Sequence, residues 1–300
     1  MTLMLLGANG QVGHELRRAL APLGKLVCTT RSGMLEDGVV CEVADFDQPD
    51  GLTALLDRIA PTIVVNAAAY TAVDKAEDDR EAAFRANAEA PGVLARWCAA
   101  HDVPLVHYST DYVFDGQGTA PYAVDAQTAP LGVYGASKLA GEAAIRAAGG
   151  RHLIFRTGWV YASHGKNFLL TMLRVGAQRD TLRVVADQVG TPTPAALIAD
   201  VTAHVLGYPG GLSGTWHLTA TGATSWHGFA EAIFAHAVAA DLVDKTPTVL
   251  PIPSSEYPTP AQRPAYSCLD TTSLREDFGL ALPNWEAGLA RVIAELAAQS

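Results

Sequence analysis

Three glycines follow the first apolar segment of the chain, and they constrain its fold more than any other feature. Gly7, Gly10 and Gly13 stand three residues apart. The residues before them (Leu3–Leu6) predict a strand, and those after them (Gln11–Ala21) have the apolar spacing of a helix. At such a turn the first glycine permits the tight bend, the second lets a pyrophosphate approach the backbone, and the third lets the helix lie close to the strand.

The helix N-terminus after this turn also offers free N–H groups and a positive dipole end to an anion. The arrangement therefore predicts a dinucleotide-binding turn. The alternative is a glycine-rich turn that binds nothing, and the strand and helix on its correct sides argue against it. The residues expected to contact the cofactor here are Gly7, Asn9, Gly10, Gln11, Val12 and Gly13.

Strands and helices alternate through the first half of the chain. Further strands are predicted at 25–29, 39–43, 62–66, 104–108 and 153–157, with helices at 49–59, 80–100 and 133–148. This alternation predicts an α/β fold of the Rossmann type, a doubly wound parallel sheet with helices on both faces. We expect residues 1–160 to form the dinucleotide-binding domain.

After residue 160 the pattern loosens, because prolines at 191–194 and 247–264 break it into shorter elements. Helical spacing persists at 195–206, 226–240 and 285–298. Residues 161–300 are therefore predicted to form a smaller C-terminal α/β lobe that binds substrate. A segment near 195–212 is expected to return to the first domain.

Composition narrows the class of protein further. The chain has 31 acidic and 21 basic residues with no basic cluster, so we expect no nucleic-acid partner. Its four cysteines match no zinc or redox spacing, which fits a reducing compartment. The apolar run at 1–7 is too short for a membrane span or signal peptide. We therefore expect a cytoplasmic protein without a membrane partner.

Two strand ends bear on the choice of cofactor. A carboxylate after the second strand is typical of an NAD site, but Thr30 and Arg31 stand there. Because Arg31 can pair with a 2′-phosphate, NADPH should be accepted, although a solvated surface arginine explains the residue almost as well. Asp45 and Phe46 follow the third strand and would contact the adenine, or Asp45 simply begins a turn.

A tyrosine and a lysine four residues apart form the most informative pair. Tyr134 and Lys138 share one face of the helix predicted at 133–148. A neighbouring ammonium should favour the phenolate, which would lower the pKa of Tyr134 toward neutrality and suit it to proton transfer. Alone the spacing is common, but here it follows the fifth strand of a dinucleotide fold.

A hydroxyl group should complete this pair at the carboxyl end of the fifth strand. Ser109 and Thr110 are adjacent there, and strand alternation lets only one of them face the pocket. That hydroxyl would orient a substrate carbonyl and stabilise the developing oxyanion. The fourth strand ends in small residues, 66–69, that would let the nicotinamide approach the backbone.

Together these residues resemble the extended short-chain dehydrogenases and, more narrowly, the dTDP-4-dehydrorhamnose reductase family. The matching blocks run nearly end to end, and the middle ones are the most specific. They include Gly-Ala-Asn-Gly-Gln-Val-Gly (7–13), the block 66–77, His-Tyr-Ser-Thr-Asp-Tyr-Val-Phe-Asp-Gly (107–116), Tyr-Gly-Ala-Ser-Lys-Leu-Ala-Gly-Glu (134–142), Arg-Thr-Gly-Trp-Val-Tyr (156–161), Asp-Gln-Val-Gly-Thr-Pro-Thr (187–193) and Arg-Pro (263–264).

The resemblance implies that NADPH or NADH reduces the C4 keto group of dTDP-4-dehydro-L-rhamnose to give dTDP-L-rhamnose. It selects Thr110 as the catalytic hydroxyl beside Tyr134, the proton donor, and Lys138. It implies that Ala68, Ala69, Tyr70, Thr71 and Tyr108 line the cofactor. The nucleotide-sugar would be met by Thr110, Asp111, Tyr134, Trp159, Asn167, Gln188 and Arg263, with the Arg263 fork on the diphosphate.

Some dimers of this family are bridged by Mg²⁺ through glutamates. Glu15 and Glu295 could match two of these ligands, but Ala195 and Ala196 occupy the region of the third. We therefore expect a homodimer without a bridging metal, with Glu15 as a weak metal candidate only.

Two other functions remain open on the sequence. A sugar-nucleotide epimerase or dehydratase has the same fold, and Asp111 beside Thr110 could be read as a dehydratase acid. A regulatory subunit resembling that of methionine adenosyltransferase would bind without catalysis. Consumption of NADPH in substrate-level amounts separates reduction from both.

Overall fold

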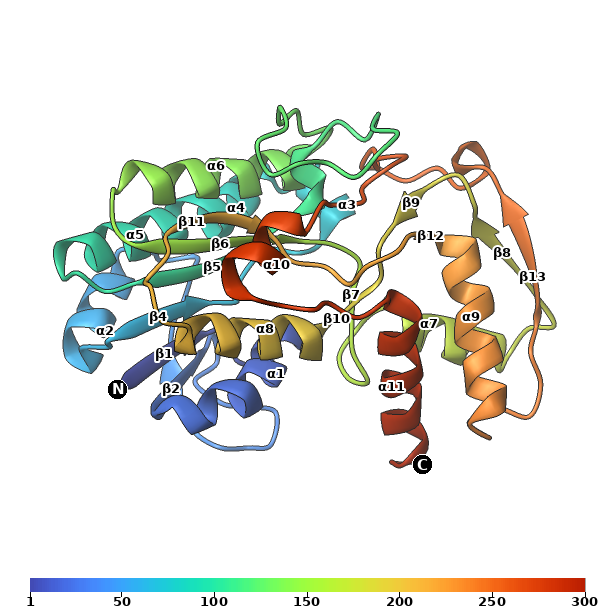
Figure 1. Cartoon of the computed structure of the whole chain (residues 1–300), viewed down its shortest axis with the longest axis horizontal. Coiled ribbons are helices and arrows are strands. Elements are labelled where there is room, and N and C mark those ends of the chain that lie inside the picture. The colour runs from blue at the N-terminus through green and yellow to red at the C-terminus, as the bar shows by residue number, and fades with distance from the viewer. Residues whose placement is uncertain (300) are drawn as a thin grey trace.

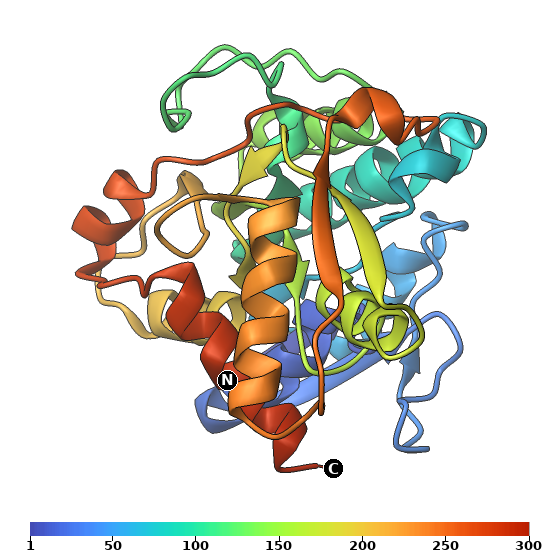
Figure 2. The ribbon, with the colours of Figure 1, turned by 90° about the vertical axis from the view of Figure 1, so that its right-hand side faces the viewer.

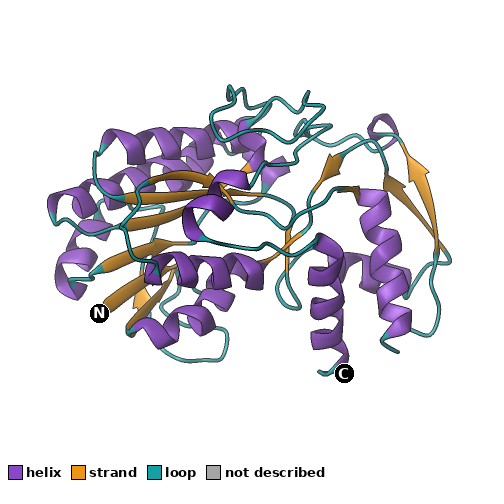
Figure 3. Ribbon diagram, in the orientation of Figure 1, coloured by secondary structure: helices purple, strands orange, loops and turns teal. Residues whose placement is uncertain are grey.

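Seven parallel strands form the central sheet of the chain, whose computed structural model describes residues 1–299. Their order is β11-β6-β5-β4-β1-β2-β3 (Figures 1 and 3). This topology confirms the predicted doubly wound Rossmann-type sheet. The strands are β1 (Thr2–Leu6), β2 (Lys25–Thr30), β3 (Glu42–Val43), β4 (Ile63–Asn66), β5 (Leu105–Thr110), β6 (His152–Thr157) and β11 (Gly214–His217).

Helices cover both faces of this sheet, as Figure 1 shows. α1 (Gln11–Leu20) and α8 (Ala195–Gly207) lie on one face, with α2 (Gly51–Ile59), α5 (Ala90–Ala100) and α6 (Val133–Ala147) on the other. The alternation of side chains along β1 builds both cores. Leu3 and Leu5 pack toward α1 and α8, whereas Met4 and Leu6 pack toward α2 and α5. All four are 0% exposed, so each contributes about 1.5–3 kcal/mol of burial.

Two predicted elements differ from the structure. The third strand is only Glu42–Val43 long, because residues 39–41 bond to the preceding loop: Leu35 N donates to Val39 O at 2.8 Å, and Cys41 N donates to Gly33 O at 2.9 Å. The helix predicted at 80–100 is divided into α4 (Arg80–Phe84), a π-helical segment (Arg85–Glu89) and α5. Such single π turns are common at functional sites.

Most of the chain after β6 forms a smaller second lobe beside the sheet. Its helices are α7 (Phe168–Gly176), α9 (Trp226–Ala239) and α11 (Trp285–Ala297), and its strand pairs are β8 (Thr181–Val185) with β13 (Thr248–Ile252), β9 (Val189–Gly190) with β12 (Thr224–Ser225), and β7 (Val160–Tyr161) with β10 (Thr193–Pro194). Figure 2 shows α9 beside β13 and β8, on which it packs through Ala230 and Phe234.

The chain crosses between these two parts more than once. α8 lies against α1, and β11 pairs with β6 at the edge of the central sheet. α10 (Thr272–Phe278) also returns, because Phe278 packs edge-on against Trp216 of β11. We propose a division into a Rossmann domain of residues 1–160 with a return segment near 195–217, and a second lobe from the remainder. Within residues 1–299, no helix combines the length and apolarity needed to cross a bilayer.

Candidate active site

A cleft of about 940 Å³ opens at the carboxyl ends of β1, β4 and β5. Strand order reverses between β1 and β4, and open α/β sheets bind their ligands at such a point. Of the predicted site residues, the cleft is lined by Gly7, Asn9, Gly10, Gln11, Val12, Thr30, Arg31, Asp45, Phe46, Ala68, Ala69, Tyr70, Thr71, Tyr108, Thr110, Asp111, Tyr134, Lys138 and Trp159.

The glycine turn has the geometry that its spacing predicts. Gly7 has a φ of +79°, which L side chains rarely adopt, and Gly10 N donates to Gly7 O at 3.0 Å. A Cβ on Gly13 would stand 2.0 Å from Gly7 O, so only glycine lets α1 lie this close to β1. Gly13 therefore shapes the turn without lining the cleft. The open cradle fits a pyrophosphate on the N-terminus of α1.

Several predicted cofactor residues also hold the walls of the cleft together. Asn9 donates through Nδ2 to Met34 O at 3.0 Å, and Thr30 Oγ1 accepts from Met34 N at 3.1 Å. Asp45 Oδ1 accepts from Asp47 N at 3.0 Å, so the turn interpretation of Asp45 is correct even though the residue also lines the cleft. The Arg31 side chain is 80% exposed, and its Nη1 lies 4.0 Å from Asp47 Oδ2, at the limit of an ion pair.

Asn87 is a structural residue that the sequence did not reveal. It lies in the π-helical segment, fully buried, and clamps Tyr70: Oδ1 accepts from Tyr70 N at 2.9 Å and Nδ2 donates to Tyr70 O at 3.0 Å. Nδ2 also donates to Ser137 Oγ on α6 at 3.0 Å. These bonds fix the position of the loop 67–71, which follows β4 and lines the cleft. The one feature of the sequence that could have indicated this role is an asparagine within a predicted helix, and that signal is weak.

The three predicted catalytic side chains line the same cleft. Thr110 ends β5, while Tyr134 and Lys138 come from the first turns of α6. The structure also separates the two adjacent hydroxyls. Both residues line the cleft, but Ser109 Oγ donates to the buried Glu142 at 2.6 Å, whereas Thr110 Oγ1 donates to Asp111 Oδ1 at 2.9 Å. The bond to Glu142 engages the Ser109 hydroxyl in the protein core, which leaves Thr110 as the candidate hydroxyl.

The electrostatics of the pair differ from the prediction. Burial raises the pKa of Tyr134 to about 12, opposed by the Thr110 hydroxyl. Lys138 does not lower it, because its Nζ donates to Tyr108 O at 2.6 Å and lies 3.3 Å from His107 Nε2. Burial lowers the pKa of Lys138 to about 8. A phenol that stays protonated at neutral pH suits proton donation to an alkoxide.

Asp111 lies beside this group and is 2% exposed. Its Oδ1 accepts from Thr110 Oγ1 at 2.9 Å. Burial raises the pKa of Asp111 to about 6, although the hydroxyls of Ser267 and Thr110 partly offset the shift. No lysine or arginine among the described residues contributes to that shift, so the carboxyl group titrates near neutrality.

The second-lobe residues are arranged differently from the expectation. Trp159 lines the cleft, with a φ of +50° and its ring stacked at 3.5 Å on Trp226. Asn167 and Gln188 do not line it. Asn167 accepts from Leu170 N as the cap of α7 and donates to Gln11 Oε1 at 2.9 Å, while Gln188 accepts from Trp226 Nε1 at 3.2 Å.

Arg263 also has a partner already. Its two terminal nitrogens each donate to one oxygen of Asp74 at 2.9 Å, and this pair links the second lobe to α3 (Val73–Ala76). The fork is therefore not free for a diphosphate in this structure. Lys166 is the second-lobe cation on the cleft wall, and its sequence context gave no signal. Ser32, Asp47 and Trp226 also line the cleft without having been predicted.

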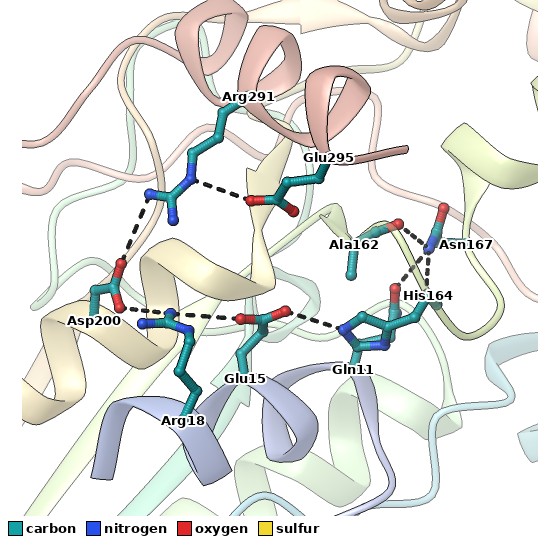
Figure 4. Close-up of polar contacts among 9 residues, drawn as sticks. All are labelled: Gln11, Glu15, Arg18, Ala162, His164, Asn167, Asp200, Arg291 and Glu295. Carbon is teal, nitrogen blue, oxygen red and sulfur yellow. Dashed lines mark hydrogen bonds and ion pairs between the residues drawn. The ribbon is translucent and has the colours of Figure 1, made fainter. Parts of the chain in front are cut away.

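The residues present do not fit the bridging Mg²⁺ of some family dimers. Glu15 accepts from His164 Nε2 at 3.1 Å and pairs with Arg18 at 3.5 Å (Figure 4). Glu295 pairs with Arg291 at 3.2 Å, and Ala195 and Ala196 bring no oxygen ligand. Arginine side chains thus offset the negative charge of the carboxylates on α1, α8 and α11. Residues 1–299 contain no group of three or more metal-ligating side chains.

The parallel sheet, the glycine turn and the threonine–tyrosine–lysine group define an extended short-chain dehydrogenase/reductase. Comparison with known proteins narrows this class. Residues 1–298 match the family model described as the RmlD substrate binding domain. The chain belongs to the dTDP-4-dehydrorhamnose reductase family of oxidoreductases.

Its relatives cover it from end to end. The dTDP-4-dehydrorhamnose reductase of Burkholderia thailandensis is 46% identical over 100% of both chains. That of Escherichia coli is 44% identical over 99% of this chain and 98% of its own. The crystal structure of the Bacillus anthracis enzyme in complex with NADP superimposes with a TM-score of 0.89, at 34% identity, over 98% of this chain and 99% of that one.

Proposed function

We propose that this protein reduces the C4 keto group of dTDP-4-dehydro-L-rhamnose to dTDP-L-rhamnose, using NADPH or NADH. The observation that carries the proposal is that Thr110, Tyr134 and Lys138 line one cleft together with the glycine turn of β1. The relatives named above bear the corresponding enzyme name, which supplies the substrate. We infer a cytoplasmic enzyme of nucleotide-sugar and surface-polysaccharide biosynthesis that forms a homodimer without a bridging metal.

The bound cofactor supplies a hydride, and the residues of the chain do the rest. The Thr110 hydroxyl, which donates to Asp111 Oδ1 in this structure, would turn toward the carbonyl oxygen and stabilise the charge that develops there. Tyr134 gives its phenolic proton to that oxygen, as its raised pKa permits. Lys138 stands one helical turn away and returns a proton to the phenolate. Trp159, fixed by Trp226, walls the cleft and excludes water.

The proposed cofactor contacts divide along the cleft. The turn 7–13 would hold the pyrophosphate, Asp45 and Phe46 the adenine, and 68–71 the nicotinamide half. Because residue 30 is a threonine and not an acidic residue, the Arg31 guanidinium could donate hydrogen bonds to the 2′-phosphate of NADPH. Arg31→Ala should then raise the KM for NADPH about tenfold and leave that for NADH unchanged. Equal changes for both cofactors would contradict the role of Arg31.

A substrate panel tests the function. We would assay dTDP-, UDP- and GDP-linked 4-keto-6-deoxy sugars by loss of the absorbance of NADPH or NADH, and identify the product by NMR. The proposal expects dTDP-4-dehydro-L-rhamnose to be reduced with one cofactor oxidised per product. Epimerised or dehydrated product without net cofactor oxidation would identify a different activity. No turnover, with a partner enzyme recovered in stoichiometric amounts, would indicate a regulatory subunit.

A further inference from the structure

A buried histidine lies behind the catalytic lysine and has no part in the mechanism above. His107 of β5 is 0% exposed, and the adjacent Asn66 of β4 is 1% exposed. The two residues are direct register partners on neighbouring strands, Asn66 at the carboxyl end of β4 and His107 in the middle of β5. Polar side chains are costly to bury at such a position unless their hydrogen bonds are satisfied. Their partners therefore define what the pair does.

The backbone fixes the orientation of the Asn66 amide. Ala68 N donates to Asn66 Oδ1 at 3.1 Å, so the other amide atom is the NH₂ group. That Nδ2 faces His107 Nδ1 at 3.1 Å and can only donate to it. His107 Nδ1 is therefore an acceptor, and the ring hydrogen of the neutral imidazole is on Nε2. Burial and the charge of Lys138 lower the pKa of His107 well below 6.5, so the ring is neutral.

This tautomer determines whether a hydrogen-bond donor or an acceptor faces Lys138 Nζ. His107 Nε2–H points at Lys138 Nζ, 3.3 Å away. An ammonium group has no lone pair with which to accept that hydrogen, whereas a neutral amine does. Nζ keeps its donor contact with Tyr108 O in either form. His107 thus favours the neutral amine.

Few other charged groups face Lys138. Glu142, one turn further along α6, favours the ammonium, but its oxygens already accept from Arg156, Arg146 and Ser109. Tyr134, one turn before Lys138, is a protonated phenol. Burial lowers the pKa of Lys138 to about 8 against the effect of Glu142.

We propose that His107, locked by Asn66 as the Nε2–H tautomer, is a positioning residue that stabilises the neutral amine of Lys138 and so lets the lysine release a proton in each turnover. The inference rests on the proposed function. The protons balance: the Tyr134 phenol protonates the alkoxide, the ammonium of Lys138 reprotonates the phenolate, and the resulting amine takes a proton from solvent. His107 stabilises the amine formed in the second step and does not itself gain or lose a proton.

The tautomer is measurable without turnover. In protein labelled with ¹⁵N-histidine, long-range ¹H–¹⁵N spectra distinguish a protonated from an unprotonated ring nitrogen, and a His107→Gln variant assigns the signal. We expect a neutral ring with the hydrogen on Nε2, unchanged between pH 6 and pH 9. A hydrogen on Nδ1, or a charged imidazolium, would overturn the proposal whatever substrate the enzyme uses.

Kinetics then test the effect on Lys138. In His107→Phe the donor facing Nζ is lost, so the limb on which kcat falls at high pH should move up by about one pH unit, and the plateau kcat should fall several-fold. The KM for the sugar should not change. His107→Gln, whose amide can accept from Asn66 and donate to Nζ, should restore the original limb. A folded His107→Phe variant with an unshifted limb, or equal shifts in both variants, would refute the role of His107.

Discussion

The Rossmann wall of the cleft and the second lobe use their polar side chains in different ways. On the Rossmann wall, Thr110, Tyr134 and Lys138 line the cleft from a strand end and a helix. In the second lobe, the side chains of Asn167, Gln188 and Arg263 do not line the cleft and are bonded to other protein groups. The first three residues are therefore placed to act on a ligand, and the other three hold the shape of the protein. Substitutions in the two regions should separate activity from stability.

The largest effect is expected from Tyr134→Phe on the Rossmann wall. Loss of the general acid should reduce kcat by about 100- to 10,000-fold, because proton donation to the alkoxide is lost. Fluorescence titration should show NADPH binding within about twofold of that of the unmodified protein, since the rest of the cleft is intact. Undiminished turnover would show that Tyr134 is not the proton donor.

Asp111→Asn should alter the pH dependence of stability. The folded pKa of about 6 lies above the ordinary value of 3.8, so the protonated carboxyl stabilises the fold fully below about pH 4. That stabilisation, about 3 kcal/mol at most, is lost as pH rises through 6. Denaturant unfolding of both proteins from pH 4 to pH 7.5 should show the unmodified protein losing stability relative to the variant. Parallel curves would mean that Asp111 is not buried and protonated as described.

Gly13→Ala should damage the glycine turn. The new Cβ would be 2.0 Å from Gly7 O, so backbone must shift, which should cost about 1–3 kcal/mol of unfolding free energy and weaken NADPH binding. Gly51→Ala is the matched control, because a Cβ there meets nothing within 4 Å. Equal behaviour of the two variants in thermal unfolding and NADPH titration would contradict the close contact of α1 with β1.

The smallest effect is expected from Asn167→Ala in the second lobe. Loss of the α7 cap should lower the unfolding free energy by about 1 kcal/mol. The KM for the nucleotide-sugar should change less than about twofold, because the side chain does not line the cleft. A tenfold rise in KM with unchanged stability would instead place Asn167 on the substrate.

Most of the fold and site features that could be predicted came from patterns among residues close together in the sequence. The glycine turn, the strand–helix alternation and the Tyr134–Lys138 spacing depend on neighbours in the sequence, and each predicted the correct element or face. Asn87 and His107 escaped notice because their partners are strand ends or loops many residues away. The second-lobe residues were assigned from resemblance alone, and nothing local shows that Arg263 pairs with Asp74, 189 residues earlier. The pKa of Tyr134 depends on burial, which a helical spacing cannot report.

The most direct test of the account is a crystal structure of the protein with NADP⁺ and dTDP-L-rhamnose. The account predicts the pyrophosphate at Gly10, and the sugar C4 hydroxyl within hydrogen-bonding distance of both Tyr134 and Thr110, facing the nicotinamide. A sugar whose C4 lies away from these two hydroxyls, or a nicotinamide outside the cleft formed by 68–71, would contradict it.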